Sequence, residues 1–135
     1  MDAGPLYALV DASDRHHLAC ADLLKTHPGP LLVPDLVVTE AMHFVGTRLG
    51  AEPEVRLLGD FADGVLTVEH VQPADWMRIA QLVWRYQDLP LGTVDASVIA
   101  IAERLGITEV ATIDLRHFRV VRPNHVAAFT LLPYG

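Results

Sequence analysis

Four acidic residues stand at positions where a carboxylate could take part in chemistry: Asp2, Glu40, Asp95 and Asp114. Glu40 lies among apolar residues, where an unpaired carboxylate is costly. If the fold brings the four together, their mutual repulsion favours a hard divalent cation, and Mg²⁺ or Mn²⁺ prefers such oxygen ligands. An ion held there could activate water against a phosphodiester. The pattern alone leaves open that these are ordinary helix caps and surface acids, above all Asp2 and Asp95.

The elements that would position these acids are short apolar strands alternating with helices. Capping and turn signals predict helices over residues 5–10, 14–26, 35–49, 52–62, 75–86 and 94–105, and strands over 31–33, 65–69, 109–113 and 129–132. Ser13 is the expected N-cap of the second helix. The helix over 94–105 is apolar on nearly all sides, so we expect it to be buried on both sides. This order predicts an α/β fold whose parallel sheet is covered by helices on both faces.

Such a fold would bring several of the acids to one edge of the sheet. In open parallel sheets, ligands bind beyond the carboxyl ends of the strands. Asp114 directly follows the strand over 109–113, and Asp2 precedes Gly4-Pro5, a typical strand-to-helix corner. Asp95 lies in the first turn of its helix, where the helix N-terminus favours an anion. We therefore expect these carboxylates to lie near one another.

The composition is that of a single globular domain over residues 1–135. Hydrophobic residues make up 51% of the chain and charged residues 20%, which excludes a disordered polypeptide. There is no apolar run of about 18 residues, so we expect no membrane span. The first five residues lack the features of a signal peptide. Cys20 is the only cysteine, which excludes an internal disulfide and suits a reducing cytoplasm.

The charge is distributed unevenly along the chain. A net charge of −7 argues against a protein that holds nucleic acid by overall electrostatic attraction. Residues 115–135, however, contain no acid and carry Arg116, His117, Arg119, Arg122 and His125. We expect Arg116, His117 and Arg119, which follow Asp114 closely, to contact phosphate groups. A solvated turn remains the alternative.

Other motifs in the sequence give weaker support for other kinds of site. Glu40 and His43 form half of a di-iron motif, but no second copy is present. His16 and His17 are adjacent and would point about 100° apart on a helix, which is poor geometry for a shared ligand. A phosphoacceptor receiver domain would need a lysine near its acidic pocket, whereas the only lysine, Lys25, is expected on a polar helix turn.

Six stretches of the sequence, taken in order, resemble PIN-domain ribonucleases, specifically the toxin subunits of VapBC-type toxin–antitoxin pairs. They are Asp-Ala-Gly-Pro-Leu-Tyr-Ala-Leu at 2–9, Ser-Asp-Arg-His-His at 13–17, Val-Thr-Glu-Ala at 38–41, Leu-Gly-Thr-Val-Asp-Ala-Ser at 91–97, Ala-Glu-Arg-Leu-Gly at 102–106 and Ala-Thr-Ile-Asp at 111–114. Any one of them is a weak signal, but the ordered set is specific and spans nearly the whole chain.

The resemblance implies a three-layer α/β/α fold with a parallel sheet of about five strands in the order 3-2-1-4-5. By position, the family's acidic residues fall on Asp2, Glu40, Asp95 and Asp114, and Thr112 supplies a supporting hydroxyl. The implied activity is hydrolysis of single-stranded or looped RNA with Mg²⁺ or Mn²⁺, inhibited by a cognate antitoxin. A homodimer is also implied. A weak or inactive PIN-like module that acts by docking a partner is the alternative.

The sequence departs from the family pattern at its start. In the family, three or four apolar residues of the central first strand precede the first Asp, whereas only Met1 precedes Asp2 here. We therefore expect either that the start of the strand has been lost, or that the central strand is truncated and holds Asp2 poorly.

Overall fold

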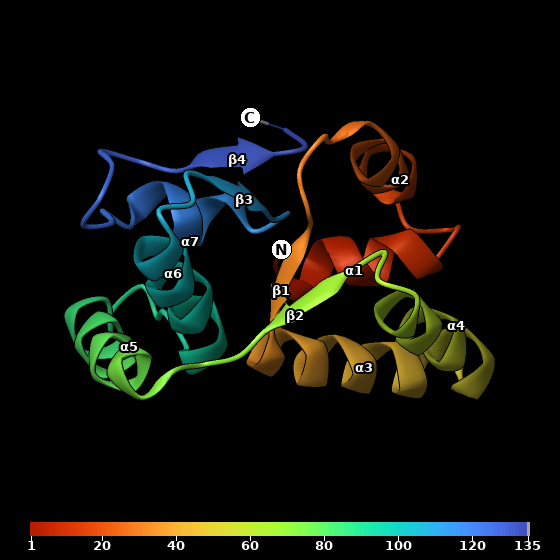
Figure 1. Ribbon diagram of the computed structural model, residues 1–135, viewed down its shortest axis with the longest axis horizontal. Helices are drawn as coiled ribbons and strands as arrows, with labels where there is room; N and C mark the ends of the chain where they lie inside the picture. Colours follow the sequence, from red (N-terminus) through yellow and green to blue (C-terminus); the bar gives the residue numbers. More distant parts are fainter. Residues whose placement is uncertain (135) are drawn as a thin grey trace.

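The computed structural model describes residues 1–134, in which helices alternate with short strands (Figure 1). The helices are α1 (Ala3–Val10), α2 (His17–Thr26), α3 (Asp35–Leu49), α4 (Ala51–Ala62), α5 (Pro73–Arg85), α6 (Thr93–Leu105) and α7 (Leu115–Val120). The strands are β1 (Leu32–Pro34), β2 (Thr67–Glu69), β3 (Glu109–Ala111) and β4 (Thr130–Leu132). The expected alternation of helices with parallel strands is confirmed.

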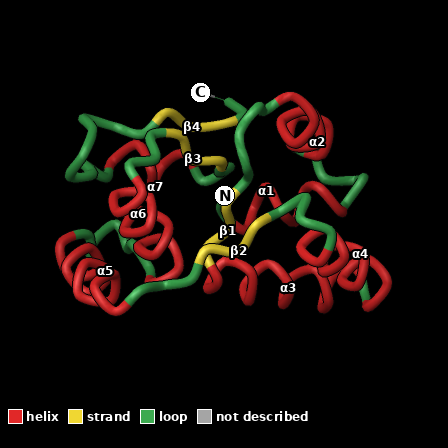
Figure 2. Tube along the Cα trace, in the orientation of Figure 1, coloured by secondary structure: helices red, strands yellow, loops and turns green. Residues whose placement is uncertain are grey.

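The strands form two parallel pairs. β1 pairs with β2, with Val33 opposite Val68, and β3 pairs with β4, with Val110 opposite Leu131. Within the described residues these are separate two-stranded sheets, in place of the single sheet of about five strands expected from the sequence. Figure 2 shows the N-terminus lying between the two pairs.

Helix α6 is the central element of the core. Seven consecutive residues, Ala96–Ala102, are buried, as expected for a helix that is apolar on nearly all sides. It packs against α5 on one side and contacts α3 and β1 on others, so the first turn of α6, which carries Asp95, is fixed by the core. None of the described helices is both long and apolar enough to cross a membrane.

One expected helix start was wrong, and one helix was not expected. Helix α2 begins at His17 instead of residue 14, because the side chains of Asp11 and Asp14 accept hydrogen bonds from the backbone N–H groups of Ser13 and His16. These bonds stabilise turns in competition with the helix, so Ser13 is not an N-cap. Helix α7 was not expected at all; it begins directly after Asp114 and has six residues, too few for a periodic pattern.

An ion-pair network around one buried carboxylate joins α5, α6 and β2. Asp75, in the first turn of α5, is 4% exposed, and both of its carboxylate oxygens lie 3.1 Å from Nε of Arg104 on α6. Asp75 also accepts the backbone N–H of Gln72, which completes a capping box. Arg104 contacts Glu69 of β2 at 3.1 Å. The carboxylate of Asp75 therefore has a structural role.

We expect Asp75→Asn to lower the free energy of unfolding by about 2 kcal/mol, because it leaves the Arg104 guanidinium without its buried partner and weakens the cap of α5. Urea denaturation monitored by circular dichroism measures the loss. Asp88→Asn, at an exposed position, is the matched control and should change stability by less than about 0.5 kcal/mol. Equal stabilities for the two variants would contradict the structural role.

Candidate active site

The hydroxyl of Thr112 links two of the predicted acids just beyond β3. Thr112 is fully buried; its Oγ1 donates to Oδ2 of Asp2 at 3.0 Å and accepts the backbone N–H of Asp114 at 3.0 Å. Asp2 caps α1 by accepting the N–H of Ala3 at 2.9 Å, and its own N–H donates to the carbonyl of Ala111. The expectation that Asp2 is poorly held was therefore wrong.

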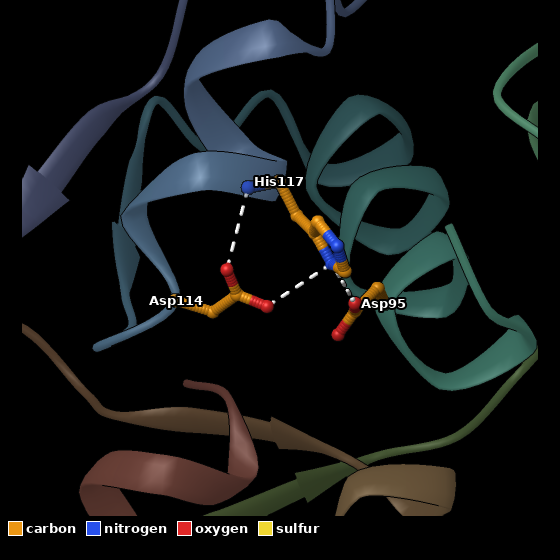
Figure 3. A group of neighbouring side chains, drawn as sticks. All are labelled: Asp95, Asp114 and His117. Atoms are coloured by element: carbon orange, nitrogen blue, oxygen red, sulfur yellow. Dashed lines mark hydrogen bonds and ion pairs between the residues drawn. The ribbon is translucent and has the colours of Figure 1, made fainter. Parts of the chain in front are cut away.

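A second group of side chains lies beside this link. Nδ1 of His117 lies 3.0 Å from Oδ2 of Asp95 and 3.0 Å from Oδ2 of Asp114, so the imidazole stands between the two carboxylates (Figure 3). Asp95 comes from the first turn of α6, while Asp114 caps α7 by accepting the N–H of His117. The N-termini of α6 and α7 thus bring together Asp95 and Asp114, which are 19 residues apart in the sequence.

Glu40 reaches the same region from the middle of α3, a helix that contacts α6. It is half-buried, and burial raises the pKa of its carboxyl, with the negative charge of Asp95 as the second cause. No direct hydrogen bond to Glu40 is found among the described residues. Its connection to the cluster is therefore electrostatic.

The negative charges act on one another through Asp95. Burial raises the pKa of Asp95, the hydrogen bond from His117 opposes this, and the charge of Asp114 adds to it. Burial, followed by the charge of Asp95, raises the pKa of Asp2 to about 6, although hydrogen bonds from Ala3 and Thr112 oppose the shift. Asp95 thus lies at the centre of the acidic cluster.

The donor atoms of this cluster fit a divalent cation. One ligand atom each from Asp95, Asp114 and His117 lies within 4.8 Å of the others. Carboxylate oxygens suit Mg²⁺ and Mn²⁺, and an imidazole nitrogen adds a donor that transition metals accept more readily than Mg²⁺ does. Burial of neighbouring carboxylates disfavours their ionised form and raises their pKa. A bound cation would stabilise that ionised form.

The other candidate residues lie apart from this cluster or play a different part. Arg116 and Arg119 are exposed on α7, whereas His117, expected among the phosphate contacts, points between the two acids. No sequence signal was available for this position of His117, because α7 was not expected and Asp95 lies on another helix. His43 is exposed on α3, and Lys25 is exposed on α2. Nδ1 of His17 contacts the carbonyl of Ala8.

Comparison with known proteins identifies the family of this chain. Residues 1–123 match the PIN domain. The chain belongs to the PIN domain family. Ribonuclease VapC26 of Mycobacterium tuberculosis (strain ATCC 25618 / H37Rv) is 31% identical over 133 residues, which cover 98% of each chain. The crystal structure of Mycobacterium tuberculosis VapC20, a Sarcin-Ricin loop cleaving toxin, superposes with a TM-score of 0.74 at 23% identity, covering 80% of this chain and 83% of that one. The expected resemblance to VapC-type PIN proteins is confirmed.

In this PIN domain, we expect Glu40→Gln to stabilise the metal-free protein by up to about 1 kcal/mol at pH 7, because it removes a charge that burial and Asp95 both disfavour; solvent screening limits the gain. Thermal melts in EDTA and in Mg²⁺ measure this. Wild type should gain more from Mg²⁺ than the variant. Glu52→Gln, at an exposed position of α4, is the control. An equal Mg²⁺ gain in wild type and Glu40→Gln would remove Glu40 from the site.

The raised pKa of Asp2 sets the sign of a pH effect. The folded state holds this proton up to about pH 6, whereas the ordinary value is 3.8, so ionisation of Asp2 disfavours the folded state. In EDTA, wild type should lose roughly 2 kcal/mol relative to Asp2→Asn as the pH rises from about 4 to about 6, and the difference should then stay constant. Urea denaturation across this range is the measurement; a difference that does not change with pH would contradict the shift.

Proposed function

We propose that this PIN domain is a metal-dependent endoribonuclease, the toxin of a toxin–antitoxin pair, which hydrolyses phosphodiester bonds of single-stranded or looped RNA. The observation that carries the proposal is the convergence of Asp95, Asp114 and His117, with Asp2 joined to the same place through Thr112. The name of the relative Ribonuclease VapC26 supports RNA as the substrate.

Asp95 and Asp114 would hold the cation, with Asp2 and Glu40 completing the acidic set and His117 as a further donor. When bound, Mg²⁺ or Mn²⁺ supplies charge stabilisation at the phosphodiester and makes water a better nucleophile at neutral pH. Direct contact of all four acids with the ion is part of this proposal. The parallel sheet is expected to follow the five-strand order 3-2-1-4-5 of the family.

The chain's own residues orient the site and attract the substrate. Thr112 holds the carboxylate of Asp2 and the backbone of Asp114 in fixed relative positions, so the acids need little rearrangement for catalysis. Arg116 and Arg119 project from α7 into solvent next to the acid cluster. Their guanidinium groups would contact the RNA phosphates and position the strand without reading its sequence.

The partners follow from the same chemistry. A cognate antitoxin would inhibit the enzyme by presenting an arginine to the acidic cluster, because a guanidinium binds carboxylates bidentately and competes with the cation. We further propose that the protein works in the cytoplasm as a homodimer. The alternative, a PIN-like module that only docks a partner, would keep the fold without cleaving RNA.

The proposal predicts RNA cleavage that requires Mg²⁺ or Mn²⁺ and stops in EDTA. Asp95→Asn and Asp114→Asn should each reduce the cleavage rate of a generic single-stranded RNA by about 100-fold or more while the protein stays folded. Asp88→Asn, the exposed control, should cleave at the wild-type rate. Gel-based cleavage assays with circular dichroism of each variant are the measurement. A folded wild type that does not cleave with either metal would favour the docking module.

A further inference from the structure

Four exposed arginines on α5, on α7 and just after α7 form no ion pair among the described residues, 1–134: Arg85, Arg116, Arg119 and Arg122. By contrast, acidic partners hold the guanidinium groups of Arg78 and Arg104. Segments 76–94 and 115–135, which carry the four, contain a single acid, Asp88. One carboxylate cannot neutralise four guanidinium groups, so this part of the surface carries an excess of positive charge.

Tyr86, at the end of α5, holds two of these arginines together. Its hydroxyl accepts the backbone N–H of Arg122 at 3.0 Å. The guanidinium carbon of Arg85 lies 5.4 Å from the centre of its ring, within range of a cation–π contact. The carbonyl of Tyr86 accepts the N–H groups of Leu89 and Leu91, in the connection that leads to the first turn of α6. The same residue therefore positions two arginines and the approach to the acidic cluster.

The guanidinium of Arg122 is fixed at the C-terminal end of α7. Its Nη1 donates to the carbonyl of Arg119 at 2.6 Å and to those of Val120 and Val121 at 3.3 and 3.2 Å. Its other nitrogens make no hydrogen bond within residues 1–134, and the side chain is exposed. A guanidinium that is already held in place loses less side-chain entropy when it binds an anion.

Helix α7 connects these arginines to the acidic cluster. It begins directly after Asp114 and carries Arg116 and Arg119 exposed on its surface. Arg122 follows its end, and Arg85 lies across the ring of Tyr86. Figure 1 shows α5, α6 and α7 on the same side of the molecule. We call these four residues the arginine strip; their order from the acidic cluster is Arg116, Arg119, Arg122 and Arg85.

The chemistry of the arginine strip favours a strand of linked phosphates. A guanidinium binds a phosphate bidentately, and a row of them that begins at the acidic cluster matches an anion that repeats along a chain. A free phosphate would meet only one or two of the four. The strip changes direction where α7 meets the end of α5, and the flexible backbone of a single strand can follow this change.

Resting on the proposed function, we propose that the arginine strip binds the single-stranded RNA on one side of the cleaved bond. The strand would leave the acidic cluster along α7, pass Arg122 and reach Arg85 at the end of α5. The contacts are to phosphates, so the strip positions the RNA and does not read its sequence. Arg122 and Arg85 thereby extend the substrate site beyond Arg116 and Arg119.

The salt dependence of binding tests the strip. Binding of the full chain to a labelled single-stranded RNA of about 12 nucleotides is measured by fluorescence anisotropy in EDTA, from about 50 to about 200 mM NaCl. Each phosphate contact contributes about 0.7 to the slope of log binding constant against log salt concentration. Arg85→Gln should lower this slope by about 0.7, and Arg85→Gln with Arg122→Gln by about 1.4. Arg56→Gln, at an exposed position of α4, is the matched control and should leave the slope unchanged. Equal slopes for Arg85→Gln and Arg56→Gln would overturn the proposal.

Two further variants keep the test valid should Arg122→Gln destabilise α7. Arg122→Lys retains the charge and should keep the wild-type slope within about 0.3. Arg85→Gln removes a side chain that contacts only the Tyr86 ring, so the variant should stay folded, and its slope alone decides. Wild-type slopes in the folded Arg85→Gln variant would count against the path even if Arg122→Gln unfolds.

Two other polyanions identify the occupant. Single-stranded DNA of the same length should show the same loss of slope in Arg85→Gln, because the contacts are to phosphates; a loss confined to RNA would contradict phosphate binding. Poly-glutamate represents an acidic protein. If Arg85→Gln weakens binding of poly-glutamate and leaves RNA binding unchanged, the strip docks an acidic protein and the proposal is overturned.

The proposed nuclease activity is tested separately from the strip. Failure of the wild type to cleave RNA with Mg²⁺ or Mn²⁺ would refute the nuclease, whereas the binding slopes are measured in EDTA and do not require cleavage. A wild type that cleaves RNA, together with unchanged slopes in Arg85→Gln, would refute the strip alone.

Discussion

Burial of neighbouring carboxylates, to which their mutual repulsion adds, is the constraint on which the arrangement of this PIN domain depends. Two unit charges about 4 Å apart interact by roughly 4 kcal/mol at the effective dielectric of a protein surface, which is a large share of the 5–15 kcal/mol that typically stabilises a domain. Burial and the charge of Asp95 accordingly raise the pKa of both Asp2 and Glu40. The metal-free site cannot ionise fully without a cost, so whatever neutralises it also stabilises the fold around it.

The fold offsets part of this repulsion with helix N-termini. Asp2 and Asp114 cap α1 and α7, and Asp95 lies in the first turn of α6. Free backbone N–H groups and the helix dipole favour a negative charge at such positions. Glu40 lies in the middle of α3 and lacks this compensation. For Glu40, a structural explanation as a cap is therefore excluded, whereas capping and metal binding are compatible roles for the other acids.

The sequence predicted those features that depend on local pattern. The apolar residues of α6 indicated a helix buried on both sides. Asp114 was expected directly after a strand because residues 110–113 form a short apolar run, although β3 ends at Ala111. The beginning of α2 depended on competition from the Asp11 and Asp14 side chains, and α7 is too short to show a period. The position of His117 between two acids from different helices is a tertiary contact, which spacing along one element could not reveal. The pairing of β1 with β2 and of β3 with β4 likewise joins segments that are far apart in the sequence.

The contrast between the net charge of −7 and the proposed RNA substrate is reduced by the geometry of α7. This one helix places His117 inwards against Asp95 and Asp114, while Arg116 and Arg119, three residues apart, lie exposed on its outer side. At physiological ionic strength, charges more than about 8 Å away are largely screened, so a phosphate near α7 responds mainly to these arginines and to the charge state of the cluster. A cation bound in the cluster would neutralise the nearest negative charges, so that a phosphate would be attracted there. Metal binding and RNA binding would then reinforce each other, because both depend on neutralising the same carboxylates.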